Sequence, residues 1–393
     1  MVAVFVIYGL ISEETDSMAA NGENQRERMR ERPRKGGKPM SKSFVNKALL
    51  GGAVAAGAAV WAIAPRTFSD KRRNYVPSIP DVWYAHRGLH DAGSGLTAQY
   101  ANESGEYVAL ARRMAMKAGY GSPSVTGAIA PENSLAAFAA ACEAGYGIEL
   151  DLQMTADGEI VVVHDGDLMR VAGDPRRIAD LTYDELTRIP LFPTDAPGAA
   201  VAAPLPGSFE NPPLVTTPDS APEGYFQHVP LFADVLKVVA GRVPLIVEYK
   251  FDDNSKWGSR DVELMEKGDA LLQAYSGAYV IESFNPAAVN WYKENRPEVC
   301  RGQLSWWPQG EEKPSDPAAL AKEYAAGALI FDWISRPDFV AYDWHGGNSP
   351  QVRLARFMGA VPVSWTVRSR DELAQCDDWF DHHIFEAFVP DEQ

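Results

Sequence analysis

The chain has 393 residues, 46% of them hydrophobic, and is long enough to bury one large core or two ordinary ones. Its formal net charge is −16, and because residues 1–73 hold 13 of the 37 Lys and Arg but only 7 of the 53 Asp and Glu, the acidic remainder argues against nucleic-acid binding. Three cysteines without CxxC spacing provide neither a disulfide framework nor a thiolate metal site: Cys142, Cys300 and Cys376.

Residues 1–47 are predicted to form a disordered basic segment. An apolar run at 1–11 is too short to span a bilayer, and residues 21–47 are polar and contain nine Lys and Arg. This composition buries too little apolar surface to form a core.

A single hydrophobic anchor helix is predicted at residues 48–64, which contain 17 residues and no charge. That length is near the lower limit for a bilayer span. Nine basic residues at 21–47 precede the segment and only four follow it before residue 74, which favours a cytoplasmic N-terminus and an extracytoplasmic remainder of a single-pass cell-membrane protein. A cleaved signal peptide ending at Ala64 and a buried Ala-rich helix are the alternatives, and Pro65 disfavours cleavage. Translation could also start at Met18 or Met40.

After a linker at 65–80, strand-like and helix-like segments alternate over residues 81–390. Strands are predicted at 82–85, 147–155, 160–164, 244–250, 279–284, 303–305, 328–333 and 361–367, and helices at 134–143, 182–187, 231–240, 261–275, 287–295, 317–326, 336–341, 349–358 and 371–375. This α/β pattern predicts a (β/α)₈ TIM barrel. A doubly wound open sheet is the alternative, but no Gly-rich dinucleotide loop follows any strand.

Polar residues gather at the ends of the predicted strands, where barrel enzymes carry their chemistry. Glu149 and Asp151 lie two positions apart and therefore project to one side of their strand. Carboxylates that close repel each other unless a cation separates them, which indicates a hard divalent metal. Scattered solvated charges, the alternative, would show no preference for strand ends, yet these ends carry His86, Arg87, Glu149, Asp151, His164, Glu248, Lys250 and Trp365.

The same segments resemble the glycerophosphodiester phosphodiesterase family of the PI-PLC-like phosphodiesterase superfamily. The resemblance covers residues 83–388 and lies in AHRG at 85–88, PENS at 131–134, GIELDLQMTADGEIVVVHD at 147–165, VEYK at 247–250 and SWTV at 364–367. It implies a (β/α)₈ barrel, a divalent cation (Ca²⁺ or Mg²⁺), and hydrolysis of small glycerophosphodiesters from phospholipid metabolism to an alcohol and sn-glycerol 3-phosphate.

Matched position by position, the resemblance implies that His86 and His164 are the catalytic acid–base pair, with His86 as the acid. It makes Arg87 a phosphate ligand and lets Glu132 and Lys250 support the substrate site. The implied metal ligands are Glu149, Asp151 and Glu248.

Elementary chemistry agrees with these roles. A phosphodiester anion repels nucleophiles, so a cation and an arginine are needed to neutralise its charge. Histidine, with a pKa near 6.5, suits both proton transfers. Trp365 offers either an apolar wall for the substrate or plain core packing.

Three departures from the family pattern concern the loops and the closing strand. An insert at 89–131 contains an amphipathic stretch at 105–118 that would either cap the catalytic rim or pack on the barrel. A Pro-, Ala- and Gly-rich loop at 191–227 is expected to be a mobile surface excursion near the active site. The closing segment has Glu386 where the family usually has a Thr-Asp pair.

Other functions remain open. The same chemistry would serve a lysophospholipase D-like enzyme held at a membrane or a hydrolase of glycerophosphate polymers such as teichoic acid. A barrel that binds without cleaving is a further alternative, although every catalytic element is present.

Overall fold

In the computed structural model of the chain, residues 56–69, 78–123, 127–192, 228–252, 256–308 and 313–391 are described. Residues 64–393 form one unit and residues 1–63 another, of which a helical stretch at 56–63 is described. The predicted disordered segment, residues 48–55 of the predicted anchor and most of the 191–227 loop lie outside the described residues. Within these described ranges, no helix has both the length and the apolar character that crossing a bilayer requires.

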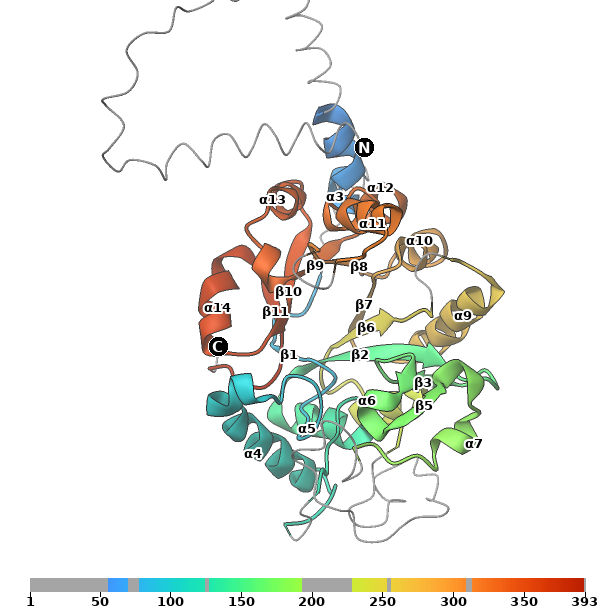
Figure 1. The fold of residues 1–393 in the computed structure, drawn as a ribbon, viewed down its shortest axis with the longest axis vertical. Coiled ribbons are helices and arrows are strands. Elements are labelled where there is room, and N and C mark those ends of the chain that lie inside the picture. The colour runs from blue at the N-terminus through green and yellow to red at the C-terminus, as the bar shows by residue number, and fades with distance from the viewer. Residues whose placement is uncertain are drawn as a thin grey trace, which may run out of the picture. The chain divides into compact units, whose positions relative to one another are not determined.

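Eight parallel strands of the described chain form a closed barrel, which confirms the predicted fold (Figure 1). Each strand pairs with the next, and β1 pairs with both β2 and β11, which closes the ring. In order around the barrel the strands are β1 (Tyr84–Ala85), β2 (Gly147–Met154), β6 (Leu245–Tyr249), β7 (Tyr279–Ser283), β8 (Arg301–Ser305), β9 (Phe339–Asp343), β10 (Val361–Val367) and β11 (His382–Phe385).

Helices connect the strands and pack around the barrel (Figure 1). Their ends follow local signals: Ser134 and Asp316 cap two of them by accepting hydrogen bonds from the amides of Ala137 and Ala319, and left-handed Gly145 ends the first. The longer helices are α4 (Ala101–Lys117), α5 (Leu135–Ala144), α8 (Phe232–Val239), α9 (Ser259–Gln273), α10 (Pro286–Asn295), α11 (Pro317–Gly327), α13 (Pro350–Phe357) and α14 (Arg370–Cys376).

The barrel interior changes from apolar to polar toward the carboxyl ends of the strands. Buried residues from seven of the strands form an apolar cluster: Tyr84, Ile246, Val280, Leu304, Phe339, Ala341, Val363 and Ile384. Alternate residues of a strand share a face. Two positions beyond members of this cluster, the same faces therefore carry His86, Glu248, Glu282, Trp365 and Glu386.

The predicted strand at 160–164 is not part of the barrel, and this correction has a simple cause. β3 (Ile160–Val162) pairs antiparallel with β2. Only a short turn separates the two strands, whereas a parallel crossover needs about a dozen residues or more. β3 instead begins an excursion of the chain outside the barrel, and this excursion has its own apolar cluster. The elements of the excursion are β4 (Asp167–Leu168), α6 (Met169–Ala172), β5 (Asp174–Arg177) and α7 (Tyr183–Leu186).

The predictions for residues 328–341 were also wrong. The apolar run at 328–333 is a turn that leads into α12 (Asp332–Ser335). The predicted helix at 336–341 is instead the connection after α12 and the first residues of β9, which begins at Phe339. Leu329 and Arg336 have positive φ values of 58° and 45°, so the chain reverses at both sides of α12. Local periodicity over so short a segment does not distinguish a buried turn from a strand.

Candidate active site

The loop after β1 carries His86 and Arg87 into the mouth of the barrel. Arg87 (φ 56°) and Gly88 (φ 80°) both have left-handed backbone conformations, which turn the chain sharply. A Cβ at Gly88 would lie 2.9 Å from the carbonyl carbon of Ala137 in α5, so the close approach of this helix requires glycine. The turn directs the Arg87 amide to Glu149, which accepts its hydrogen bond on Oε2 at 3.0 Å.

Three carboxylates from two adjacent strands converge beside this loop. Glu149 and Asp151 lie on β2, and Asp151 is paired in register with Glu248 of β6. All three are buried, and one oxygen from each lies within 4.8 Å of the others. Asp151 Oδ1 and Glu248 Oε1 accept no hydrogen bond from any described residue. Such oxygens are the ligands that Ca²⁺ and Mg²⁺ prefer, so the residues present fit a divalent cation.

Burial and mutual repulsion govern the ionisation of these carboxylates. Burial raises the pKa of Glu149 well above its usual range, and the charges of Asp151 and Glu248 add to this effect. Burial also raises the pKa of Glu248 to about 7, although Lys250 opposes it. For Asp151 the effect of burial is outweighed by nearby basic groups, Lys250 foremost, and the pKa falls below its usual range.

Two basic side chains face the carboxylates. Lys250 Nζ lies 2.8 Å from Glu248 Oε2 and 3.3 Å from Asp151 Oδ1. Arg87 Nη1 donates to Glu132 Oε1 at 2.8 Å, and Arg87 Nε lies 3.6 Å from Asp151 Oδ2. Arg87 Nε makes no hydrogen bond within the described part of the chain. This N–H is therefore a donor that an anionic ligand can use.

Each of the two predicted catalytic histidines has its Nδ1 on a carboxylate. His86 Nδ1 lies 2.7 Å from Glu386 Oε2, and His164 Nδ1 lies 2.6 Å from Asp165 Oδ1. An ionised carboxylate only accepts, so each Nδ1 carries the proton and each Nε2 is left for a ligand. His86 Nε2 lies 3.8 Å from Glu149 Oε2. Burial lowers the pKa of His86 to about 4 and lowers the pKa of His164 as well.

Arg170 of α6 links Asp165, the partner of His164, to Glu132, the partner of Arg87. Its Nε donates to Asp165 Oδ2 at 2.6 Å, and its two Nη atoms donate to the oxygens of Glu132 at 2.9 and 2.5 Å. Burial raises the pKa of Glu132, but Arg87 and Arg170 outweigh it, and the pKa falls below its usual range. Glu132 is thus the ion-pair partner of two arginines, Arg87 and Arg170.

Several polar residues of the site were not predicted. Asn133 follows Glu132 and donates to Asp151 Oδ2 at 2.8 Å. Glu282 of β7 is buried and paired in register with Glu248, and its Oε2 accepts no hydrogen bond within the described ranges. The rule that alternate residues share a face would have found Glu282, because Val280 two positions earlier is apolar and buried.

Trp365 of β10 lies at the edge of the site. It packs against the apolar cluster of the interior and meets the ring of Phe284 edge to face at 5.5 Å. The same Phe284 ring lies 5.7 Å from Lys250 Nζ. Both expectations for Trp365 are compatible with this position, because it packs on the core and borders the charged residues.

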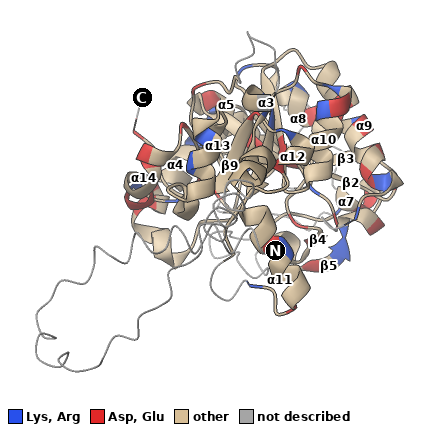
Figure 2. Ribbon diagram, turned by 90° about the horizontal axis from the view of Figure 1, so that it is seen from above, with Lys and Arg blue, Asp and Glu red and all other residues tan. Residues whose placement is uncertain are grey.

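A cavity of about 380 Å³ opens beside His164 and Lys250. Its other lining residues are Gln153, Gly166, Asp167, Arg177, Phe251 and Asp252, so the wall is mainly polar. Arg177 lies at the end of β5, a basic strand in Figure 2, and pairs with Asp252 at 2.8 Å.

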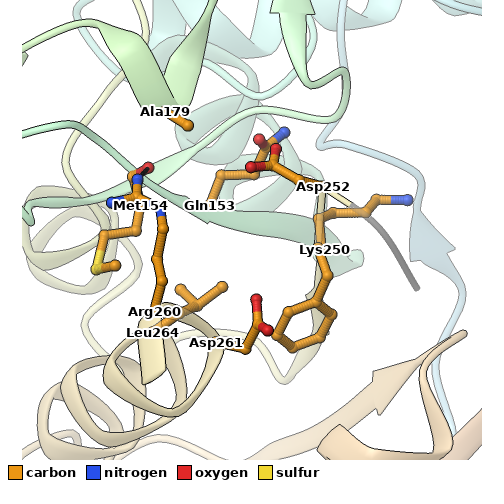
Figure 3. A pocket seen from close by; sticks show the side chains of 9 residues that line it. Gln153, Met154, Ala179, Lys250, Asp252, Arg260, Asp261 and Leu264 are labelled. Atoms are coloured by element: carbon orange, nitrogen blue, oxygen red, sulfur yellow. Dashed lines mark hydrogen bonds between the residues drawn. The ribbon is translucent and has the colours of Figure 1, made fainter. Parts of the chain in front are cut away.

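A smaller space of about 30 Å³ adjoins the cavity. Figure 3 shows the polar ends of Gln153 and Asp252 close together at its edge, while the Lys250 amine points away from it. Arg260 closes another side and donates to the Met154 carbonyl at 2.6 Å. Its size leaves room for water alone, so the larger cavity is the place for a ligand.

Comparison with known proteins settles the family. The model of the glycerophosphoryl diester phosphodiesterase family matches residues 125–385. The chain belongs to this family. Bovine glycerophosphodiester phosphodiesterase 1 is 33% identical over 283 residues, which cover 67% of this chain and 74% of that protein. A glycerophosphodiester phosphodiesterase of Bacillus subtilis is 26% identical over 235 residues, 59% of this chain and 70% of the relative.

Solved structures of similar fold include an Oleispira antarctica phosphodiesterase in complex with the product sn-glycerol-3-phosphate. It is 17% identical, with a TM-score of 0.49 over 79% of this chain and 94% of that chain. A glycerophosphodiester phosphodiesterase from Thermotoga maritima is 18% identical, with a TM-score of 0.44 over 78% of this chain and 95% of the other. Membership of the family makes the present protein a phosphodiesterase, and the expected resemblance is confirmed.

Proposed function

We propose that this phosphodiesterase hydrolyses glycerophosphodiesters to an alcohol and sn-glycerol 3-phosphate with a bound Ca²⁺ or Mg²⁺ ion. One observation carries the proposal: two histidines, each held through Nδ1 by a carboxylate, adjoin a cluster of three buried carboxylates. General acid–base catalysis of phosphodiester cleavage needs two such proton carriers beside a site for charge neutralisation.

Glu149, Asp151 and Glu248 would hold the cation, since their buried oxygens meet within 4.8 Å. When bound, a divalent cation neutralises phosphate charge and polarises the phosphoryl oxygen. Arg87 and Lys250 face the three carboxylates and would bind and orient the phosphate. With these groups in place, the diester anion no longer repels an attacking water.

The histidines divide the proton transfers. At one Nε2 a neutral imidazole takes a proton from the attacking water, whose oxygen forms the new bond to phosphorus. At the other Nε2 an imidazolium donates its proton to the alcohol oxygen as the bond between that oxygen and phosphorus breaks. The products are the free alcohol and sn-glycerol 3-phosphate, and each histidine ends in the protonation state opposite to its start.

The polar wall of the cavity favours a deacylated diester over a lysophospholipid. Phe251 is the one apolar side chain among its lining residues in the described chain, and charged groups such as Asp167 and Arg177 border the same space. An acyl chain would leave these polar groups without water or partners, which is costly. A polar cavity is also compatible with hydrolysis of glycerophosphate polymers, and an assay with such a polymer distinguishes this alternative from hydrolysis of small diesters.

The full-length protein is expected to release sn-glycerol 3-phosphate from glycerophosphocholine, measured by a coupled enzymatic assay with Ca²⁺ or Mg²⁺ present. We expect kcat/KM for glycerophosphocholine to exceed that for lysophosphatidylcholine at least ~10-fold, a difference of about 1.4 kcal/mol in transition-state binding. Poly(glycerol phosphate) serves as the third substrate. Faster cleavage of the lysolipid or of the polymer would reassign the substrate, and no cleavage of any diester would refute the proposal.

We also propose that the protein is a single-pass membrane protein with the barrel on the extracytoplasmic side. The charge pattern around residues 48–64 supports this. Ala64 and Arg66 of the barrel unit bond to Arg336 and Pro337, just before β9, at 2.7 and 3.0 Å. Both contacts are made within the barrel unit, close to the amino end of β9.

This placement is tested by fractionating cells that express the full chain. We expect the protein in the membrane fraction, with the barrel accessible to protease from the extracytoplasmic side. Deleting the residues before Lys71 should release it to the soluble fraction. Recovery of the uncleaved full-length chain entirely in the soluble fraction would contradict the proposal.

A further inference from the structure

Glu386, the residue after β11, is a fully buried carboxylate with every oxygen engaged. Its Oε2 lies 2.7 Å from His86 Nδ1 and accepts a hydrogen bond from Ser94 Oγ at 2.7 Å. Its Oε1 accepts a hydrogen bond from Arg368 Nε at 2.6 Å. His90 Nε2 also approaches Oε2, at 3.6 Å. The side chain is therefore held from both sides and has no freedom to turn away from His86.

The surroundings keep Glu386 ionised. Burial alone would raise its pKa, but His86 and Arg368 outweigh burial and hold the pKa well below its usual range. A carboxylate has no proton to donate, so the hydrogen of the short contact belongs to His86 Nδ1. His86 consequently presents an unprotonated Nε2 to the three carboxylates when its ring is neutral.

The insert at 89–131 contributes directly to this arrangement. Ser94 bonds to Glu386 through its hydroxyl and to Glu132 Oε2 through its amide, at 2.5 Å. Gly95 packs closely against the carboxylate: a Cβ at this position would lie 2.8 Å from Glu386 Cδ, so a larger residue would collide with it.

The two ends of the insert are also tied to each other. Buried Asp91 accepts hydrogen bonds from the amides of Ile129 and Ala130 and from Arg112 of α4. Helix α4 buries Tyr107, Ala111 and Ala115 and lies against α5. The predicted helix of the insert thus packs on the barrel, while the stretch before it reaches the catalytic rim.

We infer that Glu386 is a positioning residue that holds His86 in its catalytic orientation and tautomer, and that Ser94 of the insert helps to hold Glu386. The inference rests on the proposed function, since it concerns a histidine assigned to proton transfer there. The other histidine has a parallel arrangement in which Asp165, held by Arg170, bonds to His164 Nδ1. Each histidine thus has its Nδ1 on a carboxylate, and each of these carboxylates accepts a hydrogen bond from an arginine.

Replacing Glu386 with glutamine separates this role from simple packing. Arg368 requires an oxygen where it now meets Oε1, which places the new amide NH₂ toward His86 Nδ1. That NH₂ can only donate, so His86 would have to carry its proton on Nε2 instead. A ring with the wrong tautomer keeps its size and place but loses its proton-transfer function.

We expect Glu386→Gln to lower kcat of the cation-loaded full-length enzyme at least ~10²-fold, as loss of general acid–base catalysis does, with KM changed less than about 3-fold. Ser94→Ala should lower kcat to a smaller extent. The matched control is Glu372→Gln, since Glu372 accepts hydrogen bonds from the same insert (Tyr100) and from the Arg368 amide without touching His86. Its kcat should stay within about 3-fold of the parent.

A spectroscopic measurement on the unmutated protein does not depend on turnover. Long-range ¹H–¹⁵N spectra, with the His86 signals assigned by comparison with His86→Gln, are expected to show the proton on Nδ1. The Nε2-protonated tautomer in the parent, or an unchanged tautomer together with parental kcat in a folded Glu386→Gln, would overturn the inference. If the parent cleaves no diester, the proposed function fails, and the tautomer still decides the role of Glu386.

Discussion

Replacing His86 or His164 with alanine is expected to lower kcat on glycerophosphocholine at least ~10²-fold, because general acid–base catalysis contributes about 10²–10⁴. Neither side chain belongs to an apolar core cluster, so folding should be retained. Steady-state kinetics and a thermal melt of each variant measure the two effects. Near-parental activity in both variants would refute the assignment of the pair.

A diester with a nitrophenyl leaving group tells the acid from the base. Its leaving group needs no proton, so this substrate should rescue only the variant that lost the acid. The family resemblance favours His86 as the acid, whereas burial lowers its pKa to about 4, which favours the neutral form of a base. The activities of the two variants on the nitrophenyl diester decide between these assignments, since rescue of His164→Ala alone would make His164 the acid and His86 the base.

The double variant provides an internal check. If both histidines act in one step, the loss of kcat in the double variant should be far smaller than the product of the losses in the two single variants. Multiplied losses would instead mean that the two side chains act in separate steps.

The barrel was predictable from the sequence because alternation of strands and helices is a repeated signal over about 300 residues. Individual elements were less certain. The Thr155–Glu159 turn already excluded a parallel crossover into 160–164, so this error was avoidable from loop length alone. The apolar run at 328–333 gave no comparable warning, because burial of a turn beside α12 depends on contacts far apart in the chain.

Site residues were predictable where a motif joins them in the sequence, as for Glu149 and Asp151 on one strand. The contact between Glu386 and Ser94 was not, because 292 positions separate them, and only closure of the barrel by β11 brings Glu386 to Ser94 and His86. Arg170 escaped prediction for the same kind of reason, since its role depends on the fold of the excursion after β3.

Removing divalent cations is expected to abolish activity, and adding Ca²⁺ or Mg²⁺ should restore it. Glu149, Asp151 and Glu248 crowd three carboxyl groups into one buried place, where burial and repulsion oppose their joint ionisation. A divalent cation reverses that balance, so binding should also stabilise the fold. At a cation concentration of 100 times Kd the gain is about 2.7 kcal/mol, which a thermal melt detects without any assay of activity.

The same measurement distinguishes this cluster from an ordinary buried acid. Asp151→Asn should abolish both turnover and the stabilisation by cation. Asp332→Asn is the matched control, because Asp332 is also a buried carboxylate whose oxygens accept no hydrogen bond within the described chain, yet it lies on α12 outside the cluster. It should respond to cation as the parent does. Full activity after thorough chelation, or equal stabilisation of Asp151→Asn and the parent, would remove the metal from the mechanism.

Cation binding should also depend on pH in a defined direction. Without cation the pKa of Glu248 is about 7, raised chiefly by burial, so below pH 7 a proton occupies the carboxyl group that the cation needs. Binding must then release that proton together with any proton held by Glu149, whose pKa burial also raises, so Kd should fall at least about tenfold per pH unit as pH rises toward 7. Glu248→Gln removes the group that titrates and should bind the cation more weakly at pH 8. An affinity that is flat between pH 5.5 and 8, measured by calorimetry, would show that Glu248 is not a ligand.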